Sequence, residues 1–199
     1  LNFTHERYEI GEDRGTSDLV VPGLGWSTNS RRSILDRPRS GFLLNLRVSG
    51  TGEFLGSDTE FLQAEAGGRL ILPLWSTARL LTRAEVAATA KDDFRELPFS
   101  VRYFAGGDYS VRGYDYKTLG PTDANGVVVG GAHKLVASAE IDQVVLPNWS
   151  VAAFVDVGNA FDTFGAMSLK TGVGGGIRWY SPLGPARFDV RVPLDKDAP

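Results

Sequence analysis

The chain has 199 residues, with 24 glycines, no cysteine and a formal net charge of -3 at pH 7. This length fits one large domain or two small ones. The charge and the lack of any basic run exclude nucleic acid as an expected partner. No apolar run approaches the roughly 20 residues of a transmembrane helix, whereas a membrane-spanning strand needs only about 9–11.

About nine segments read as strands, and none reads as a confident helix. The pattern is weak near 1–11, and near 19–30 Val20, Leu24 and Trp26 share one parity. From residue 42 onward, apolar and polar side chains alternate clearly, as in Phe42, Leu44 and Leu46 against Asn45 and Arg47. The same period of two continues near 61–72, 78–90, 133–145, 151–158, 170–180 and 186–194. It predicts an all-β antiparallel sheet with one apolar and one charged face.

The lengths of the connections favour a transmembrane β-barrel over a soluble β-sandwich, which would show the same alternation. Tight turns at 72–76, 146–150 and 181–185 alternate with longer connections, the longest of which is 91–131. Trp75 and Trp149 fall in two equivalent tight turns, where we expect them at the membrane interface rather than in a core.

An odd number of strands does not close a bacterial single-chain barrel, and open edges in lipid cost several kcal/mol per unpaired group. We therefore expect 1–199 to be part of a barrel from a longer protein.

The connection 91–131 is too aromatic for a solvated linker. It contains the glycine pair Gly106 and Gly107, which permits positive φ and close backbone approach. We expect it to be packed against another part of the protein rather than solvated. Arg112 would then be a charge on a packed loop, and it would need an acidic partner.

The tetrad Val111-Arg112-Gly113-Tyr114 resembles the signature of the bacterial outer-membrane assembly and secretion superfamily, which includes BamA, TamA and the two-partner-secretion transporters. Across 100–194 the chain resembles TamA, the translocation and assembly module subunit. The motifs that carry this similarity are Phe104-Ala105-Gly106-Gly107-Asp108, Arg112-Gly113-Tyr114-Asp115-Tyr116-Lys117, Phe154-Val155-Asp156-Val157-Gly158 and Arg178-Trp179-Tyr180-Ser181.

The resemblance implies a sixteen-stranded barrel in the outer membrane of a Gram-negative bacterium, preceded by periplasmic POTRA domains that lie outside this chain. The chain would supply about nine strands from the C-terminal portion. The implied function is insertion or secretion of β-barrel clients such as autotransporters. The implied partners are the lipid bilayer, unfolded outer-membrane proteins and a TamB-like protein anchored in the inner membrane.

The resemblance also implies that the loop folds into the barrel and that its arginine meets acidic residues of the inner wall. The matching acids are Glu140 and Asp156, which the alternation independently places on the polar face. Without the tetrad, two solvated carboxylates in a lumen would be the simpler interpretation. We call the loop residues that carry the resemblance the loop motif; they are Gly106, Gly107, Asp108, Val111, Arg112, Gly113 and Tyr114.

Other functions stay open at this point. They are BamA-like general assembly, two-partner secretion of one substrate, and a passive porin-type channel. An enzyme is disfavoured, because the only histidines, His5 and His133, lie far apart and no serine has an evident base and acid relay. No metal or cofactor is expected, since cysteine is absent and no histidine pair has ligand spacing.

Overall fold

A computed structural model describes residues 2–10, 13–30, 37–57, 59–91, 97–181 and 184–195. Within these ranges the chain forms ten strands: β1 (Asn2–Ile10), β2 (Asp13–Val21), β3 (Gly23–Asn29), β4 (Gly41–Thr51), β5 (Phe61–Trp75), β6 (Ala78–Ala90), β7 (His133–Leu146), β8 (Trp149–Phe161), β9 (Lys170–Ser181) and β10 (Gly184–Pro193). Three one-turn 3-10 helices, η1 (Glu53–Leu55), η3 (Phe99–Val101) and η4 (Phe164–Ala166), lie in the connections. No helix among the described residues is long and apolar enough to cross a membrane.

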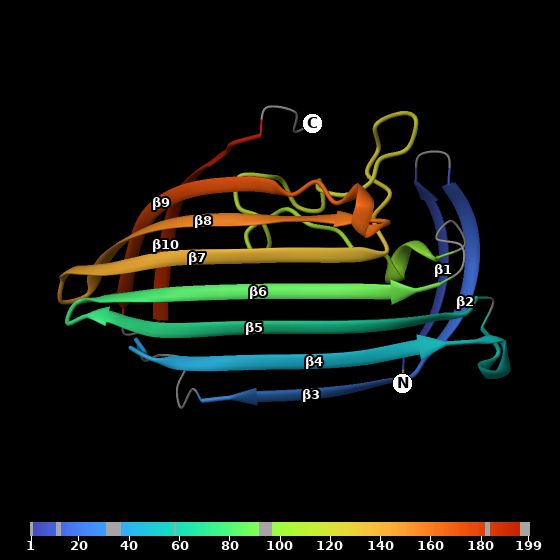
Figure 1. The fold of residues 1–199 in the computed structure, drawn as a ribbon, viewed down its shortest axis with the longest axis horizontal. Coiled ribbons are helices and arrows are strands. Elements are labelled where there is room, and N and C mark those ends of the chain that lie inside the picture. The colour runs from blue at the N-terminus through green and yellow to red at the C-terminus, as the bar shows by residue number, and fades with distance from the viewer. Residues whose placement is uncertain are drawn as a thin grey trace.

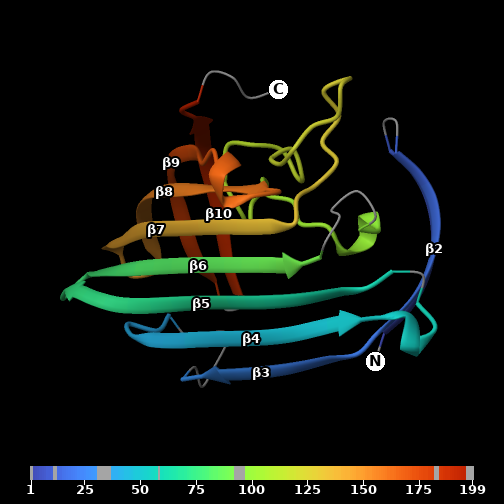
Figure 2. The ribbon, with the colours of Figure 1, turned by 45° about the vertical axis from the view of Figure 1, so that its right-hand side comes forward.

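The predicted all-β antiparallel architecture is confirmed. Strands β3 to β10 form one eight-stranded sheet in which every strand pairs with its neighbours in sequence. Figures 1 and 2 show this sheet curving from β3 to β10. The chain is thus a meander, and its shape is that of a barrel wall rather than of two packed sheets.

The two faces of the sheet differ as the alternation predicts. Large apolar side chains are exposed along one face of every strand from β3 to β10, for example Leu24, Leu44, Leu70, Val86, Ile141, Val155, Ile177 and Val190. The opposite face buries the charged side chains Arg79, Glu140, Asp142, Asp156 and Arg178, and Arg112 of the long loop is buried against it. A continuous exposed apolar face with a charged interior is typical of a transmembrane barrel, in which lipid covers the outside.

The start of the chain differs from the sequence expectation. The pattern predicts one strand over 19–30, but the chain changes pairing partner at Pro22. Strand β2 pairs with β1 in a separate two-stranded sheet, and β3 pairs with β4 in the large sheet. Proline has no N–H to donate to a ladder, which explains why the break falls there.

The shortest connections lie at one end of the sheet and the longest at the other, although the β3–β4 connection at the end with the short turns spans residues 30–40. Two residues join β5 to β6, and two join β7 to β8. The connection from β6 to β7 is the longest, and residues 92–96 of it lie outside the described residues, as do 182–183 in the predicted turn between β9 and β10. The described part, residues 97–132 (green to yellow in Figures 1 and 2), begins beside β2 and β5, where Leu97 packs with Leu19 and Phe61, and then contacts β6 to β10.

Candidate functional site: a loop seated on the inner wall

The strand register aligns five inner-face residues in one row across the sheet. Arg69 of β5 lies opposite Arg83 of β6, Arg83 opposite Ser138 of β7, Ser138 opposite Asp156 of β8, and Asp156 opposite Gly172 of β9. We call Arg69, Arg83, Ser138, Asp156 and Gly172 the cross-sheet row. The loop 97–132 lies over the part of this row that runs from Arg83 to Gly172, as the contacts below establish.

Arg112 is the centre of these contacts. Its backbone N–H, Nε and Nη2 all donate to the Asp156 carboxylate, at 3.0, 2.6 and 2.9 Å. Nη1 donates to Glu140 Oε2 at 2.6 Å, and Nη2 also donates to Ser138 Oγ at 3.2 Å. The guanidinium carbon lies 3.4 Å from the centre of the Phe154 ring. The side chain is thus held by a bidentate contact with Asp156, a single hydrogen bond to Glu140 and an aromatic face.

This charge cluster is buried. Arg112 is 4% exposed and Asp156 is 0% exposed. Burial alone would lower the pKa of Arg112, but the hydrogen bonds to Asp156 and Glu140 outweigh it and raise that pKa above its usual value. Arg112 therefore stays charged. Removing one partner of such a pair typically costs about 3–5 kcal/mol, because the other charge stays buried without compensation.

Glu140 extends the cluster along the wall. Its Oε1 accepts from Arg178 Nη2 at 3.0 Å, while Oε2 accepts from Arg112. Arg178 in turn is paired with Asp189 of β10, and Asp189 accepts from Arg187 Nη2 at 3.1 Å. Charges of opposite sign therefore alternate from the loop through β7 and β9 to β10.

The backbone of the loop also fits the wall closely. A Cβ at Gly172 would overlap the Arg112 carbonyl oxygen, so only glycine leaves room for the loop at this point of the row. Arg83 donates from Nη1 to the Tyr109 carbonyl oxygen, and from Nη2 to that of Ser110 at 2.5 Å. Gly113 has a φ of 102°, and a Cβ there would lie 3.1 Å from the Pro193 nitrogen of β10.

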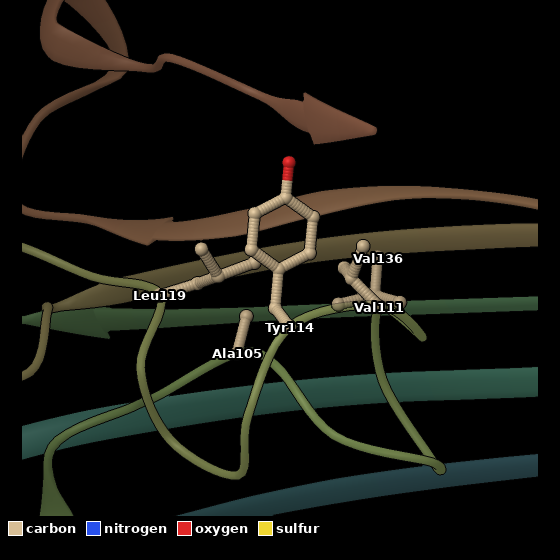
Figure 3. Close-up of a cluster of buried hydrophobic side chains, with 5 residues drawn as sticks. All are labelled: Ala105, Val111, Tyr114, Leu119 and Val136. Carbon is tan, nitrogen blue, oxygen red and sulfur yellow. The ribbon is translucent and has the colours of Figure 1, made fainter. Parts of the chain in front are cut away.

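Apolar contacts complete the docking. Ala105, Val111, Tyr114 and Leu119 of the loop pack with Val136 of β7 in a buried cluster (Figure 3). The Tyr114 hydroxyl donates to Asp195 Oδ2 at 2.9 Å and to the Thr171 carbonyl oxygen at 3.2 Å. Burial and the hydrogen bond to Asp195 raise the pKa of Tyr114, and the Thr171 amide and the Tyr114 hydroxyl lower the pKa of Asp195. The loop therefore also forms hydrogen bonds with β9 and with the segment that follows β10.

The remaining residues of the loop motif shape its tip. Gly106 and Gly107 have φ values of 96° and 97°, which permit the tight turn that brings the Gly107 amide to 3.0 Å from the Tyr114 carbonyl oxygen. Asp108 pairs with Arg191 of β10. The motif residues thus occur in one compact loop whose contacts reach β6 through β10.

Trp75 and Trp149 lie at the end of the sheet where the turns are short. They are 54% and 40% exposed. Trp75 donates from Nε1 to Gln143 Oε1 at 2.8 Å, and Trp149 stacks on Trp179 at 5.9 Å between ring centres. Each indole therefore offers a large apolar surface close to one rim.

The candidate chemistry of an enzyme does not come together in the described part of the chain. His133 begins β7 and stacks on Phe164, and Ser138 accepts a hydrogen bond from Arg112. No group of three or more potential metal ligands occurs among the described residues.

Several residues of the site lack a signal in the sequence. Arg83 is an ordinary inner-face arginine by pattern, and only strand register shows that it reaches the loop. Arg178 belongs to a motif that carries the resemblance, but its contact with Glu140 is evident only from strand register. The glycine run that contains Gly172 suggests close backbone approach, although the approaching segment is not evident from it.

Together, the apolar outer face, the charged inner face and the seated loop define an integral outer-membrane β-barrel. The chain belongs to the Omp85 superfamily, whose domain matches residues 2–198. It is located in the outer membrane of a Gram-negative bacterium.

Curated relatives include the outer membrane protein assembly factors BamA of Neisseria meningitidis serogroup B and of Nitratidesulfovibrio vulgaris. The first is 29% identical, covering 87% of this chain and 26% of the relative; the second is 27% identical, covering 81% and 21%. The chain thus spans about a quarter of the length of these relatives. Its fold resembles that of Haemophilus ducreyi BamA lacking POTRA domains 1–3, with a TM-score of 0.74 at 23% identity over 96% of this chain and 43% of that one.

Proposed function

We propose that this chain is the loop-bearing part of an outer-membrane protein assembly factor, which helps β-barrel clients to insert into or cross the outer membrane. The observation that carries the proposal is Arg112, paired with both Glu140 and Asp156 while its loop is seated on the inner wall. A barrel that opens toward lipid can offer strand edges to a client strand. In this mechanism the seated loop keeps β6 to β10 in register while the barrel opens elsewhere.

The type of assembly factor is a finer question. The curated relatives named above are BamA proteins, so BamA-like general assembly fits at least as well as the TamA-like role that the sequence resemblance implies. A TamA-like protein would act on autotransporters and bind a TamB-like partner in the inner membrane. A BamA-like protein would act on a broad range of barrels. In both cases we propose periplasmic POTRA domains in the parent protein, and an activity without a catalytic step.

Reconstitution of the full-length protein in liposomes tests the assembly role. Unfolded barrel clients, including an autotransporter, are added, and their folding is followed by the shift in gel mobility between heated and unheated samples. We expect faster folding with the wild-type protein and at least a tenfold loss of that acceleration in Arg112→Ala. Glu85→Gln, which breaks a partly exposed pair with Lys134 on the same face, is the matched control. No acceleration by the wild type would contradict the proposal.

A passive channel is the second candidate, because a charged inner face also suits a water-filled pore. Planar-bilayer recording separates the two functions. A porin gives a steady conductance that is independent of clients, together with no acceleration of client folding. Disulfide formation between cysteines at Val111 and Val136, which leaves Arg112 intact, tests whether the loop is seated in native membranes. The pair Val111 and Val155 is the control, since Val155 is exposed on the outer face.

A further inference from the structure

A cavity of about 250 Å³ lies beside the seated loop, over the end of the cross-sheet row that the loop does not occupy. Its lining includes Arg69 and Arg83 of the row, Asp108 and Tyr109 of the loop tip, Glu140 of β7 and Arg187 of β10. None of the contacts that seat the loop uses the Arg69 side chain. The cavity is therefore a feature separate from the Arg112 cluster, although Arg112 borders it.

The charges around this cavity are unbalanced. Arg69 and Arg83 lie directly opposite each other on β5 and β6, an arrangement of like charges that destabilises a sheet. The inner-face arginine of the neighbouring strand, Arg47 of β4, lies opposite Glu65 instead. Arg69 and Arg83 are paired across the strands with no acidic side chain between them. An anion from outside the described residues would neutralise their repulsion.

The acids that line the cavity are already engaged. Asp108 pairs with Arg191, and Glu140 is shared by Arg112 and Arg178. Arg83 uses both terminal nitrogens on neutral carbonyl oxygens of the loop, and its buried Nε has no hydrogen-bond partner among the described residues. Arg69 makes no hydrogen bond or ion pair with any residue in the described ranges.

We propose that this cavity binds a single oxyanion, a carboxylate or a phosphate, between Arg69 and Arg83. A guanidinium presents its N–H donors in a fork that matches two oxygens of such a group. An anion between the two arginines replaces their mutual repulsion with two attractive contacts. The site lies on the inner face of the sheet, so the anion comes from a polypeptide segment inside the barrel or from solution. This inference does not depend on the assembly role.

Calorimetric titration of the full-length protein in detergent micelles tests the site. The probes are sodium phosphate and an acetylated, amidated peptide rich in aspartate, both at constant ionic strength. We expect one saturable site for at least one probe. Arg69→Gln should weaken binding by about tenfold or more, since it removes a charge-assisted hydrogen bond to the anion. Arg47→Gln, an inner-face arginine outside this cavity, should leave the affinity within about twofold of wild type.

The two probes identify the source of the anion. Binding of the acidic peptide that depends on Arg69, with no binding of its asparagine counterpart, assigns the site to a polypeptide carboxylate. Binding of phosphate alone assigns it to a free ion. The proposal is overturned if neither probe gives saturable binding, or if Arg69→Gln and Arg47→Gln bind alike. Since the Arg69 side chain makes no hydrogen bond or ion pair with a described residue, its replacement should preserve the wild-type circular dichroism spectrum.

Discussion

Replacement of Asp156 by asparagine is the sharpest test of the seated loop. The change keeps the shape of the side chain and removes its charge. Asp156 accepts three hydrogen bonds from Arg112, and the two side chains are 0% and 5% exposed. An asparagine amide would point N–H donors at the N–H donors of Arg112. Breaking a buried pair in this way costs about 3–5 kcal/mol, which corresponds to roughly two to four orders of magnitude in the population of the released loop.

Limited trypsin digestion of the full-length protein in detergent measures that population. Lys117 is an exposed loop residue, and cleavage after it should require release of the loop from the wall. When opening is fast relative to cleavage, the cleavage rate follows the open population. We expect Asp156→Asn to be cleaved about 100-fold faster than wild type or more, and Glu85→Gln to stay within a few-fold. Equal rates for the two variants would refute the view that the buried ion pair holds the loop.

The remaining predictions use the same protein. Gly172→Ala should accelerate cleavage at Lys117 about tenfold or more, because the added Cβ would overlap the Arg112 carbonyl oxygen. Gly67→Ala is the control, and it should have little effect because a Cβ there would make only ordinary contacts. Tyr114→Phe removes the hydroxyl that donates to Asp195 and Thr171 and should weaken docking by about 1 kcal/mol, seen as a cleavage rate raised a few-fold. Because the folded-state pKa of Asp195 is lowered, its contribution is present above its ordinary pKa of about 4 and is lost as the pH falls through the lowered value. Hydrogen exchange of the Thr171 amide should therefore accelerate on acidification below about pH 4, relative to Asp195→Asn. Asp142→Asn, at a separate buried pair with Arg79 near the short turns, should lower the urea midpoint of the barrel without affecting cleavage at Lys117.

The fold was largely predictable because the period-two alternation carries it. Side chains such as Leu44 and Arg47 fall on opposite faces whatever the register, so face assignment needs only the local sequence. The alternation does not predict the break at Pro22, since the pattern on its two sides is similar and only strand pairing reveals the change of partner. Pairing is a long-range property that alternation does not encode.

The site was predictable in part for the same reason. A charge on an aromatic, glycine-rich loop requires a partner, and this requirement directs attention from Arg112 to the inner-face acids. The structure has Arg112 in contact with Glu140 and Asp156. The roles of Arg83, Gly172 and Asp195 depend on which residues share a row or follow the last strand. Register determines these neighbours, and no single strand in the sequence reveals them.

The cross-sheet row has a consequence for how the wall can be built. A slip of one residue in the pairing of β8 would turn Asp156 toward lipid and bring a neighbouring valine inward. The same slip in β7 or β9 would remove Ser138 or replace Gly172 with a side chain that blocks the Arg112 backbone. The loop can therefore dock only on a wall whose strands are paired in this one register. Docking of the loop on the inner face therefore reports that these strands are paired in the correct register.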